Sequence, residues 1–214
     1  MAVIGAGIGG LAAACALRDR GFEVSVHERT PELGEVGAGL QLGPNAVKVL
    51  RALGLEQALR AAAFEPANIV SLAWDDARLR FREPLKAIAA KKFGAPYLTV
   101  HRADLHRLLC EQLPARVIHL DARCVGVSST ATSATAIFAD GTEIEADVIV
   151  GADGINSVVR ESLFGAQPVR YTQQMAWRCM VPIACVPTEV GPGLTVAVGR
   201  DEYVGWIGPD GHVI

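Results

Sequence analysis

Three glycines near the N-terminus constrain the fold of this chain more than any other feature. Gly5, Gly7 and Gly10 follow an apolar stretch that ends at Ile4, and apolar residues then recur at helical spacing up to Gly21. Glycine commonly ends helices, and "FEVSVHE" after Gly21 is predicted as a strand. The sequence therefore predicts a β-α-β unit over residues 2–28, and hence an α/β fold.

The spacing G-x-G-x-x-G between a strand and a helix is typical of a dinucleotide-binding turn. One glycine permits the tight turn, one lets the backbone approach a pyrophosphate, and one packs the helix against the strand. The helix N-terminus offers unpaired N–H groups and a partial positive charge to the phosphates. Glu28 follows 18 positions after Gly10, where a carboxylate can accept both ribose hydroxyls of an adenosine. These features indicate NAD or FAD.

A second strand, glycine turn and helix are predicted at residues 147–160, "DVIVGADGINSVVR". The apolar strand predicts burial on both faces within a parallel sheet. Asp153 precedes Gly154 at the strand end, and its carboxylate suits hydroxyls, backbone amides or an arginine rather than a phosphate. Two such turns favour one long ligand. The alternative is coincidence, since strand-to-helix turns often carry glycine for backbone reasons alone.

Two further helices are predicted between these turns. One begins near Pro44 and ends at Gly54, and the other runs from about residue 103 to 113. Arg102 stands where a strand meets the second of them, so its guanidinium can reach a phosphate or a ribityl chain. The side chains expected to share one face are Ala46, Val49, Leu50 and Leu53 in the first helix, and Leu105, Leu108, Leu109 and Gln112 in the second.

Hairpins and short strands indicate a second domain. "IVSLAW" and "RLRF" flank an acidic turn, and "MAWRCMVPI", "LTVAVG", "YVGWIG" and "HVI" follow Gly165. Another hairpin, "TAIFA" and "TEIEA" around Asp140-Gly141, falls within the dinucleotide domain. We expect a dinucleotide domain over 1–67 and 98–165, and part of an antiparallel-sheet domain over 68–97 and 166–214. Because the chain ends just as "HVI" opens a strand, we expect it to be a fragment.

Composition argues against several classes of partner. The net charge is −3 and the pI about 6.0, with no Lys/Arg-rich run, which argues against nucleic acid. No apolar run approaches the roughly 18 residues of a membrane helix, and no basic leader is found, so we expect a cytoplasmic protein. The five cysteines and five histidines are scattered without ligand spacing, so we expect neither disulfide nor metal.

Four segments, in this order and spacing, resemble the class A FAD-dependent aromatic monooxygenases, the group of p-hydroxybenzoate, salicylate and 3-hydroxybenzoate hydroxylases. They are "VIGAGIGGLAAACALRDRGFEVSVHER", "EVGAGLQLGPNAVKVLRALGL", "HRADLHRLL" and "DVIVGADGINSVVR". The resemblance implies a Rossmann-like FAD domain of the GR2 type. It also implies reduction of FAD by NADH or NADPH, reaction with O₂ to a C4a-hydroperoxide, and oxygen transfer to a small aromatic substrate.

The resemblance also implies roles for particular residues. The pyrophosphate would lie on Gly5, Gly7, Ile8, Gly9 and Gly10, the adenosine on Glu28, Arg29 and Val125, the flavin phosphate or ribityl chain on Arg102, and the isoalloxazine beside Gly39, Leu40 and Gln41. Asp153 and Gly154 would close over the same FAD and serve pyridine nucleotide use, and His212 in "GHVI" would be the base that contacts the substrate hydroxyl. A homodimer is left open.

The resemblance leaves alternatives open. The family's later G-D-A-A/G-H-like motif is absent, so we expect this chain alone to bind FAD weakly and not to hydroxylate. An NAD-dependent dehydrogenase would explain the first turn and Glu28, but not Arg102 or Asp153. A non-enzymatic scaffold like the GDP-dissociation inhibitors would not need the intact phosphate loop. Epoxidation and demethylating hydroxylation stay open, whereas the W-x-W-x-I-P motif of halogenases is absent.

Overall fold

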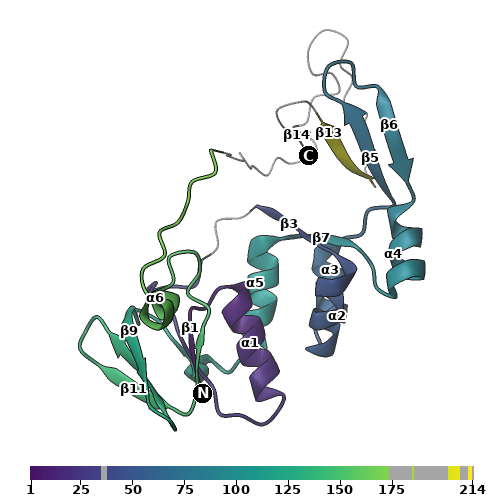
Figure 1. Ribbon diagram of the computed structural model, residues 1–214. Helices are drawn as coiled ribbons and strands as arrows, with labels where there is room; N and C mark the ends of the chain where they lie inside the picture. Colours follow the sequence, from purple (N-terminus) through teal and green to yellow (C-terminus); the bar gives the residue numbers. More distant parts are fainter. Residues whose placement is uncertain (35–37, 174–184, 186–201, 208–211, 214) are drawn as a thin grey trace. The chain divides into compact units, whose positions relative to one another are not determined.

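The chain forms two compact units, and each is described here by itself. The computed structural model describes residues 1–34, 38–173, 185, 202–207 and 212–213 (Figure 1). The first unit joins Met1–Val36 with Arg102–Trp177, and the second joins Gly37–His101 with Arg178–Ile214. This division differs from the predicted domain boundaries, which follow cofactor binding rather than compactness and stay a prediction.

A parallel sheet with strand order β12-β1-β2-β8 forms the centre of the first unit. Ile4 in β1 lies opposite His27 in β2 on one side and Gly151 in β12 on the other, so the strands end together. Helices α1 and α5 pack against each other, and α1 also packs against β1 and β2. The elements are β1 Ala2–Ile4, α1 Ile8–Arg18, β2 Ser25–His27, α5 Arg102–Glu111, the 3₁₀ helix η1 Ala115–Val117, β8 Ile118–His119 and β12 Ile149–Gly151.

Two predictions for this sheet are wrong in part. Strand β12 is parallel to β1 as expected, but Val148 before it is 43% exposed, and Ile149 and Val150 are only half-buried. In the described residues β12 is an edge strand with one neighbour, which leaves part of its surface open to solvent. The strand predicted over 22–28 is also shorter, because Phe22 lies exposed before β2 begins.

Helix α5 buries the apolar face that its sequence predicts, with one exchange. Leu105, Leu108 and Leu109 are buried, but Gln112 is exposed because the helix ends at Glu111. His106 is buried in its place. A polar side chain therefore enters the interior of the first unit, where it needs a hydrogen-bond partner.

A three-stranded antiparallel sheet, β11-β10-β9, completes the first unit with helix α6. The Asp140-Gly141 turn forms the predicted hairpin, with Gly141 at φ +87°. Ile4 of the parallel sheet, Ala136 and Phe138 of this sheet, and Val159 of α6 share one buried cluster. Figure 1 shows α6 beside β9. The elements are β9 Cys124–Ser129, β10 Ala134–Phe138, β11 Glu143–Ala146 and α6 Val158–Phe164.

The second unit contains two small sheets, of order β14-β13-β5-β6 and β3-β7-β4. The expected hairpin of β5 and β6 is present, and β13 pairs parallel to β5 and antiparallel to β14. The predicted strands "MAWRCMVPI" and "LTVAVG" lie outside the described residues. The elements are β3 Gly39–Leu42, α2 Pro44–Ala52, α3 Glu56–Ala62, β4 Ala63–Phe64, β5 Asn68–Ala73, β6 Leu79–Glu83, α4 Leu85–Phe93, β7 Leu98–His101, β13 Glu202–Ile207 and β14 His212–Val213.

Helix α2 begins at Pro44 as predicted and buries Leu50 of the predicted face, but Val47 is buried in place of Val49. Val47 and Leu50 are buried, whereas Val49, which the sequence places on the inner face, is 57% exposed. The helix packs against β3, α3 and α4. Apolar spacing alone admits either face, and the neighbouring elements select between them.

Candidate dinucleotide-binding site

The first glycine turn requires glycine at two positions because its backbone is closely packed. Gly5 has φ +102°, and a Cβ built on it would lie 2.5 Å from the carbonyl oxygen of Ala152. A Cβ on Gly10 would lie 1.9 Å from the carbonyl oxygen of Gly5. The N–H of Gly5 also donates to the carbonyl of His27 at 2.8 Å. These contacts explain the tight turn and the close packing of α1 that the motif predicts.

The N-terminus of α1 faces open space at its other two glycines. Apart from its chain neighbours and the nearby backbone of the helix itself, no described heavy atom lies within 4 Å of a Cβ placed on Gly7 or Gly9. Gly7 is the N-cap, and in the described structure it makes no side-chain cap, nor does the first turn carry an acidic residue. The first N–H groups of the helix are thus available to an anion, which the helix dipole favours.

Glu28, at the end of β2, is bonded to the glycine turn itself. Its Oε2 accepts from the N–H of Ala6 at 2.8 Å, and its Oε1 accepts from the N–H of Thr30 at 3.1 Å. The Thr30 hydroxyl donates to the same Oε1 at 3.3 Å. A carboxylate has about four acceptor positions, so these bonds leave capacity for a ribose hydroxyl. Glu28 therefore supports the loop as well as offering acceptors.

The structure brings the two glycine turns together. The N–H of Ala152, which follows β12, donates to the carbonyl of Ile4 at 2.8 Å. The Ala152 carbonyl oxygen would lie 2.5 Å from a Cβ built on Gly5, and the Ala152 Cβ would lie 3.2 Å from one built on Gly10. Since β1 and β12 are parallel neighbours, both turns lie at the same edge of the sheet. Carboxyl ends of parallel strands are where α/β folds bind ligands.

Asp153 caps the helix that follows the second turn. Its Oδ1 accepts from the hydroxyl of Ser157 at 2.5 Å, and its Oδ2 accepts from the N–H groups of Val158 at 2.6 Å and Val159 at 3.2 Å. Ser157 is the N-cap of α6 and accepts from the N–H of Arg160 at 3.0 Å. Hydroxyl and amide partners are of the kinds that the sequence predicts for Asp153, and all three belong to its own chain.

The remaining predicted residues of the first unit lie on several elements. Arg102 is the first residue of α5 and is half-buried, Arg29 is exposed just after Glu28, and Val125 is 47% exposed in β9. Gly154 has φ +82° and an open side. Their cofactor contacts stay predictions, as do those of the glycine turn.

In the second unit, Gly39, Leu40 and Gln41 form β3, paired antiparallel to β7. The Gln41 amide donates to the Tyr203 hydroxyl at 2.7 Å, and the Tyr203 and Tyr97 rings lie 6.3 Å apart. Burial raises the pKa of both tyrosines. The described backbone places His212 in β14, and its role as base stays a prediction.

Sequence reasoning missed three polar residues. His106 contacts the glycine turn, with its Nε2 2.7 Å from the carbonyl oxygen of Ala6. His27 is buried under the turn, where its ring stacks on His119 at 4.8 Å, and burial lowers its pKa to about 4. Tyr203 bonds the strand predicted to flank the flavin. The position of His106 between Leu105 and Leu109 on a buried helical face was the available signal for it.

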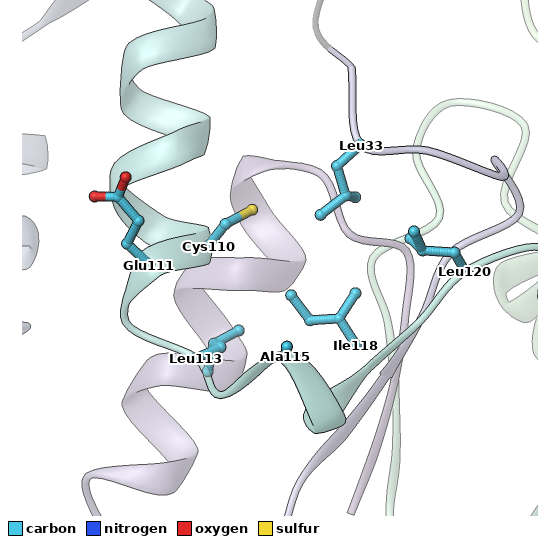
Figure 2. Close-up of a pocket in the computed structure, with 7 residues that line it drawn as sticks. All are labelled: Leu33, Cys110, Glu111, Leu113, Ala115, Ile118 and Leu120. Carbon is cyan, nitrogen blue, oxygen red and sulfur yellow. The ribbon is translucent and has the colours of Figure 1, made fainter.

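A separate hollow of about 330 Å³ opens in the first unit (Figure 2). Six of its lining residues are apolar or carry sulfur, and Figure 2 shows the Glu111 carboxylate pointing away from them. Burial raises the pKa of the Cys110 thiol, so the thiol stays protonated at neutral pH. We assign no chemistry to this hollow. Its lining residues are Leu33, Cys110, Glu111, Leu113, Ala115, Ile118 and Leu120.

Comparison with known proteins identifies the family. Residues 1–192 match the FAD binding domain family, and the chain belongs to it. The chain is 41% identical over 215 residues to 3-amino-4-hydroxybenzoate 2-monooxygenase of Streptomyces cremeus, covering 100% of this chain and 52% of that protein. It is 39% identical over 214 residues to 6-hydroxynicotinate 3-monooxygenase of Pseudomonas fluorescens, covering 100% and 54%. The chain thus spans about half the length of the curated relatives it matches.

Solved structures agree with this family. HpxO of Klebsiella pneumoniae, complexed with FAD and uric acid, superposes with a TM-score of 0.72 at 27% identity, covering 79% of this chain and 43% of that one. 2,6-Dihydroxypyridine-3-hydroxylase from Arthrobacter nicotinovorans gives 0.65 at 30% identity, covering 78% and 40%. The predicted resemblance, the α/β FAD-binding fold and FAD as the cofactor are confirmed at the level of the family.

The described residues contain neither a membrane-spanning helix nor a cluster of metal ligands. None of the helices in this part of the chain is long and apolar enough to cross a membrane. No group of three or more His, Cys, Asp or Glu side chains there is arranged to hold a metal ion.

Proposed function

We propose that the complete protein is an FAD-dependent monooxygenase that hydroxylates a small aromatic, phenolic acid-like substrate with NADH or NADPH and O₂. The observation that carries the proposal is the backbone hydrogen bond from Ala152 to Ile4, because it joins both glycine turns at one sheet edge. The relatives support the reaction class, since they are named as monooxygenases of hydroxybenzoate- and hydroxynicotinate-type compounds. Because NAD(P)H is supplied in the cytoplasm, we place the protein there.

The residues present fit a flavin dinucleotide. The open N-terminus of α1 at Gly7 suits the pyrophosphate, and Glu28 keeps acceptor capacity for the adenosine ribose. Arg102 begins α5 and suits a phosphate or the ribityl chain. We infer that residues 1–67 and 98–165 hold the cofactor and that residues 68–97 and 166–214 contribute to the substrate domain.

When bound, FAD supplies electron transfer from NAD(P)H and the activation of O₂. The task of the chain is to fix the dinucleotide, to exclude water and to remove the phenolic proton of the substrate. His212 is our proposed base, because a neutral imidazole near pH 7 accepts such a proton. Gln41, held by Tyr203, would keep β3 in place beside the flavin ring.

The first test is a titration of the full-length protein with FAD, followed by flavin fluorescence. We expect saturable binding that Gly7→Ala weakens, because the new methyl group occupies the space of the phosphates. Gly126→Ala is the matched control, since its Cβ would meet its nearest neighbour, Ile137, only at 4.0 Å. A folded protein that binds no FAD would overturn the proposal.

The second test screens hydroxylated aromatic acids for stimulation of NAD(P)H oxidation. We expect a stimulating compound to gain one labelled oxygen atom from O₂, measured by mass spectrometry. His212→Ala should lower the rate of oxygen transfer while leaving FAD affinity unchanged. Oxidation without oxygen insertion by any substrate would instead favour a reductase or dehydrogenase.

A further inference from the structure

The buried imidazole of His106 makes a directional contact with the glycine turn. Its Nε2 lies 2.7 Å from the carbonyl oxygen of Ala6, and the side chain is almost fully buried. A carbonyl oxygen only accepts, so Nε2 carries the proton. The other ring nitrogen, Nδ1, lies 3.6 Å from the Cys110 sulfur, and the thiol can donate to it. Both ring nitrogens thus have a hydrogen-bond partner.

The same residue, Ala6, is held from its other side. Its N–H donates to Glu28 Oε2 at 2.8 Å while its carbonyl accepts from His106. One of these bonds comes from the end of β2 and the other from helix α5. Ala6 lies between two glycines of the turn, Gly5 and Gly7, whose backbone has few steric restraints of its own. Both polar groups of Ala6 are therefore anchored by side chains that are distant in sequence.

Helix α5 also carries Arg102, the proposed partner of the flavin phosphate or ribityl chain. Arg102 and His106 are four residues apart and so lie on one side of the helix. Farther along, the Cys15 thiol of α1 donates to the Leu109 carbonyl at 3.7 Å, and Arg18 donates to the Gln112 carbonyl at 3.2 Å. These bonds hold α5 along α1, and the His106–Ala6 bond extends the contact to the glycine turn.

We propose that His106 is a positioning residue that joins the glycine turn to α5, so that the turn and Arg102 meet one FAD in a fixed geometry. The inference rests on the proposed contact of Arg102 with FAD, and not on the hydroxylation proposed above. A purely structural histidine would change the stability of the fold without coupling to Arg102. The two roles are therefore separable by measuring affinity and coupling together.

The test compares FAD dissociation constants in the full-length protein, at a temperature where circular dichroism shows each variant folded. We expect His106→Leu to weaken binding about tenfold, the effect of losing one hydrogen bond to a buried carbonyl. His106→Gln keeps a donor of similar reach and should stay within about threefold. Leu108→Ala removes a buried side chain of the same helix and should bind FAD like the wild type.

Coupling is measured by combining His106→Leu with Arg102→Ala. We expect the double variant to lose less affinity than the product of the two single losses, because Arg102 is already misplaced without His106. Any of three results would overturn the inference: wild-type FAD affinity in His106→Leu, single losses that simply multiply in the double variant, or an equal loss of affinity in Leu108→Ala. If His106→Leu does not fold, His106→Gln against the shorter His106→Asn gives the same comparison. Absence of FAD binding in the folded wild type would instead overturn the proposed function.

Discussion

The two glycine turns at the ends of β1 and β12 follow the same strand–glycine–helix pattern, but their helices begin in opposite ways. In the described structure α1 begins at Gly7 without a side-chain cap or an acidic residue in its first turn. Helix α6 has Ser157 as its N-cap, and Asp153 accepts from that hydroxyl and from two backbone N–H groups. One helix N-terminus is open to an anion, and the other is satisfied by its own chain.

The difference follows from the side chains at the turns. Gly5, Ala6 and Gly7 carry no side-chain acceptor, so the first N–H groups of α1 are available to a ligand. Asp153 stands four residues before Ser157 and supplies a charged acceptor to α6. A shared glycine pattern thus identifies the turn, while the residues beside the glycines decide whether it binds an anion. The expected contribution of the second turn to FAD binding is to support the first.

The largest expected effect is that of Gly10→Ala in the first turn. The added Cβ would lie 1.9 Å from the Gly5 carbonyl oxygen, which is backbone and cannot turn away. We expect a loss of more than about 3 kcal/mol in the free energy of unfolding, measured by urea denaturation. Gly9→Ala is the control: its Cβ has open space, so stability should hold or rise by up to about 1 kcal/mol. Equal stability of the two variants would contradict this reading of the turn.

Acid should weaken the support beneath the first turn. Gly5 is bonded to the carbonyl of His27, whose buried ring has its pKa lowered from 6.5 to about 4, first by burial and then by His119. As the pH falls, His27 therefore binds a proton in the unfolded chain before it does so in the folded chain. The free energy of unfolding should hold above about pH 6.5 and fall toward pH 4, by up to about 3 kcal/mol.

The measurement is urea denaturation of the wild type and His27→Phe at several pH values. Carboxylates contribute an acid slope to both proteins, so the difference between the slopes isolates His27. Phe is apolar and of similar size, and it can pack on Phe138, which lies 5.1 Å from the His27 ring. Parallel pH profiles of the two proteins would show that His27 titrates normally in the fold.

In the second turn we expect Asp153→Ala to cost about 2 kcal/mol of stability. The change leaves the N–H groups of Val158 and Val159 and the Ser157 hydroxyl without their acceptor. Asp153→Asn keeps one oxygen and should cost about half as much. Thermal unfolding gives the stability, and an FAD titration gives the affinity. A loss of affinity much larger than the loss of stability would indicate direct cofactor contact by Asp153.

Local sterics made much of this site predictable from the sequence. The β-α-β unit with its glycine turn and the Asp140-Gly141 hairpin each depend on one continuous segment of the chain, and Glu28 ends the first of these segments. Turn geometry and helix caps follow from backbone restrictions that a short segment carries in itself. These features could therefore be predicted without any knowledge of the rest of the fold.

Contacts between distant residues were not predictable in the same way. The exposed Val49 of α2 and the parallel pairing of β13 with β5 depend on which elements become neighbours. The bond from His106 to Ala6 joins residues 100 positions apart. A histidine among leucines does not indicate which residue it will bond. Hydrophobic spacing identifies a buried face but not the polar atom opposite a buried side chain.

The smallest expected change in stability comes from giving the first turn the cap of the second. Gly7→Asp places an acceptor at the N-cap of α1, whose φ of −69° and ψ of 174° already suit a capping residue. We expect a gain of up to about 1 kcal/mol in the free energy of unfolding, and FAD binding weaker by at least tenfold, since the carboxylate repels the pyrophosphate. Gly7→Asn caps without charge, so it should gain similar stability and lose less affinity. If Gly7→Asp and Gly7→Asn bind FAD with equal affinity, the added bulk and not the charge accounts for the weaker binding.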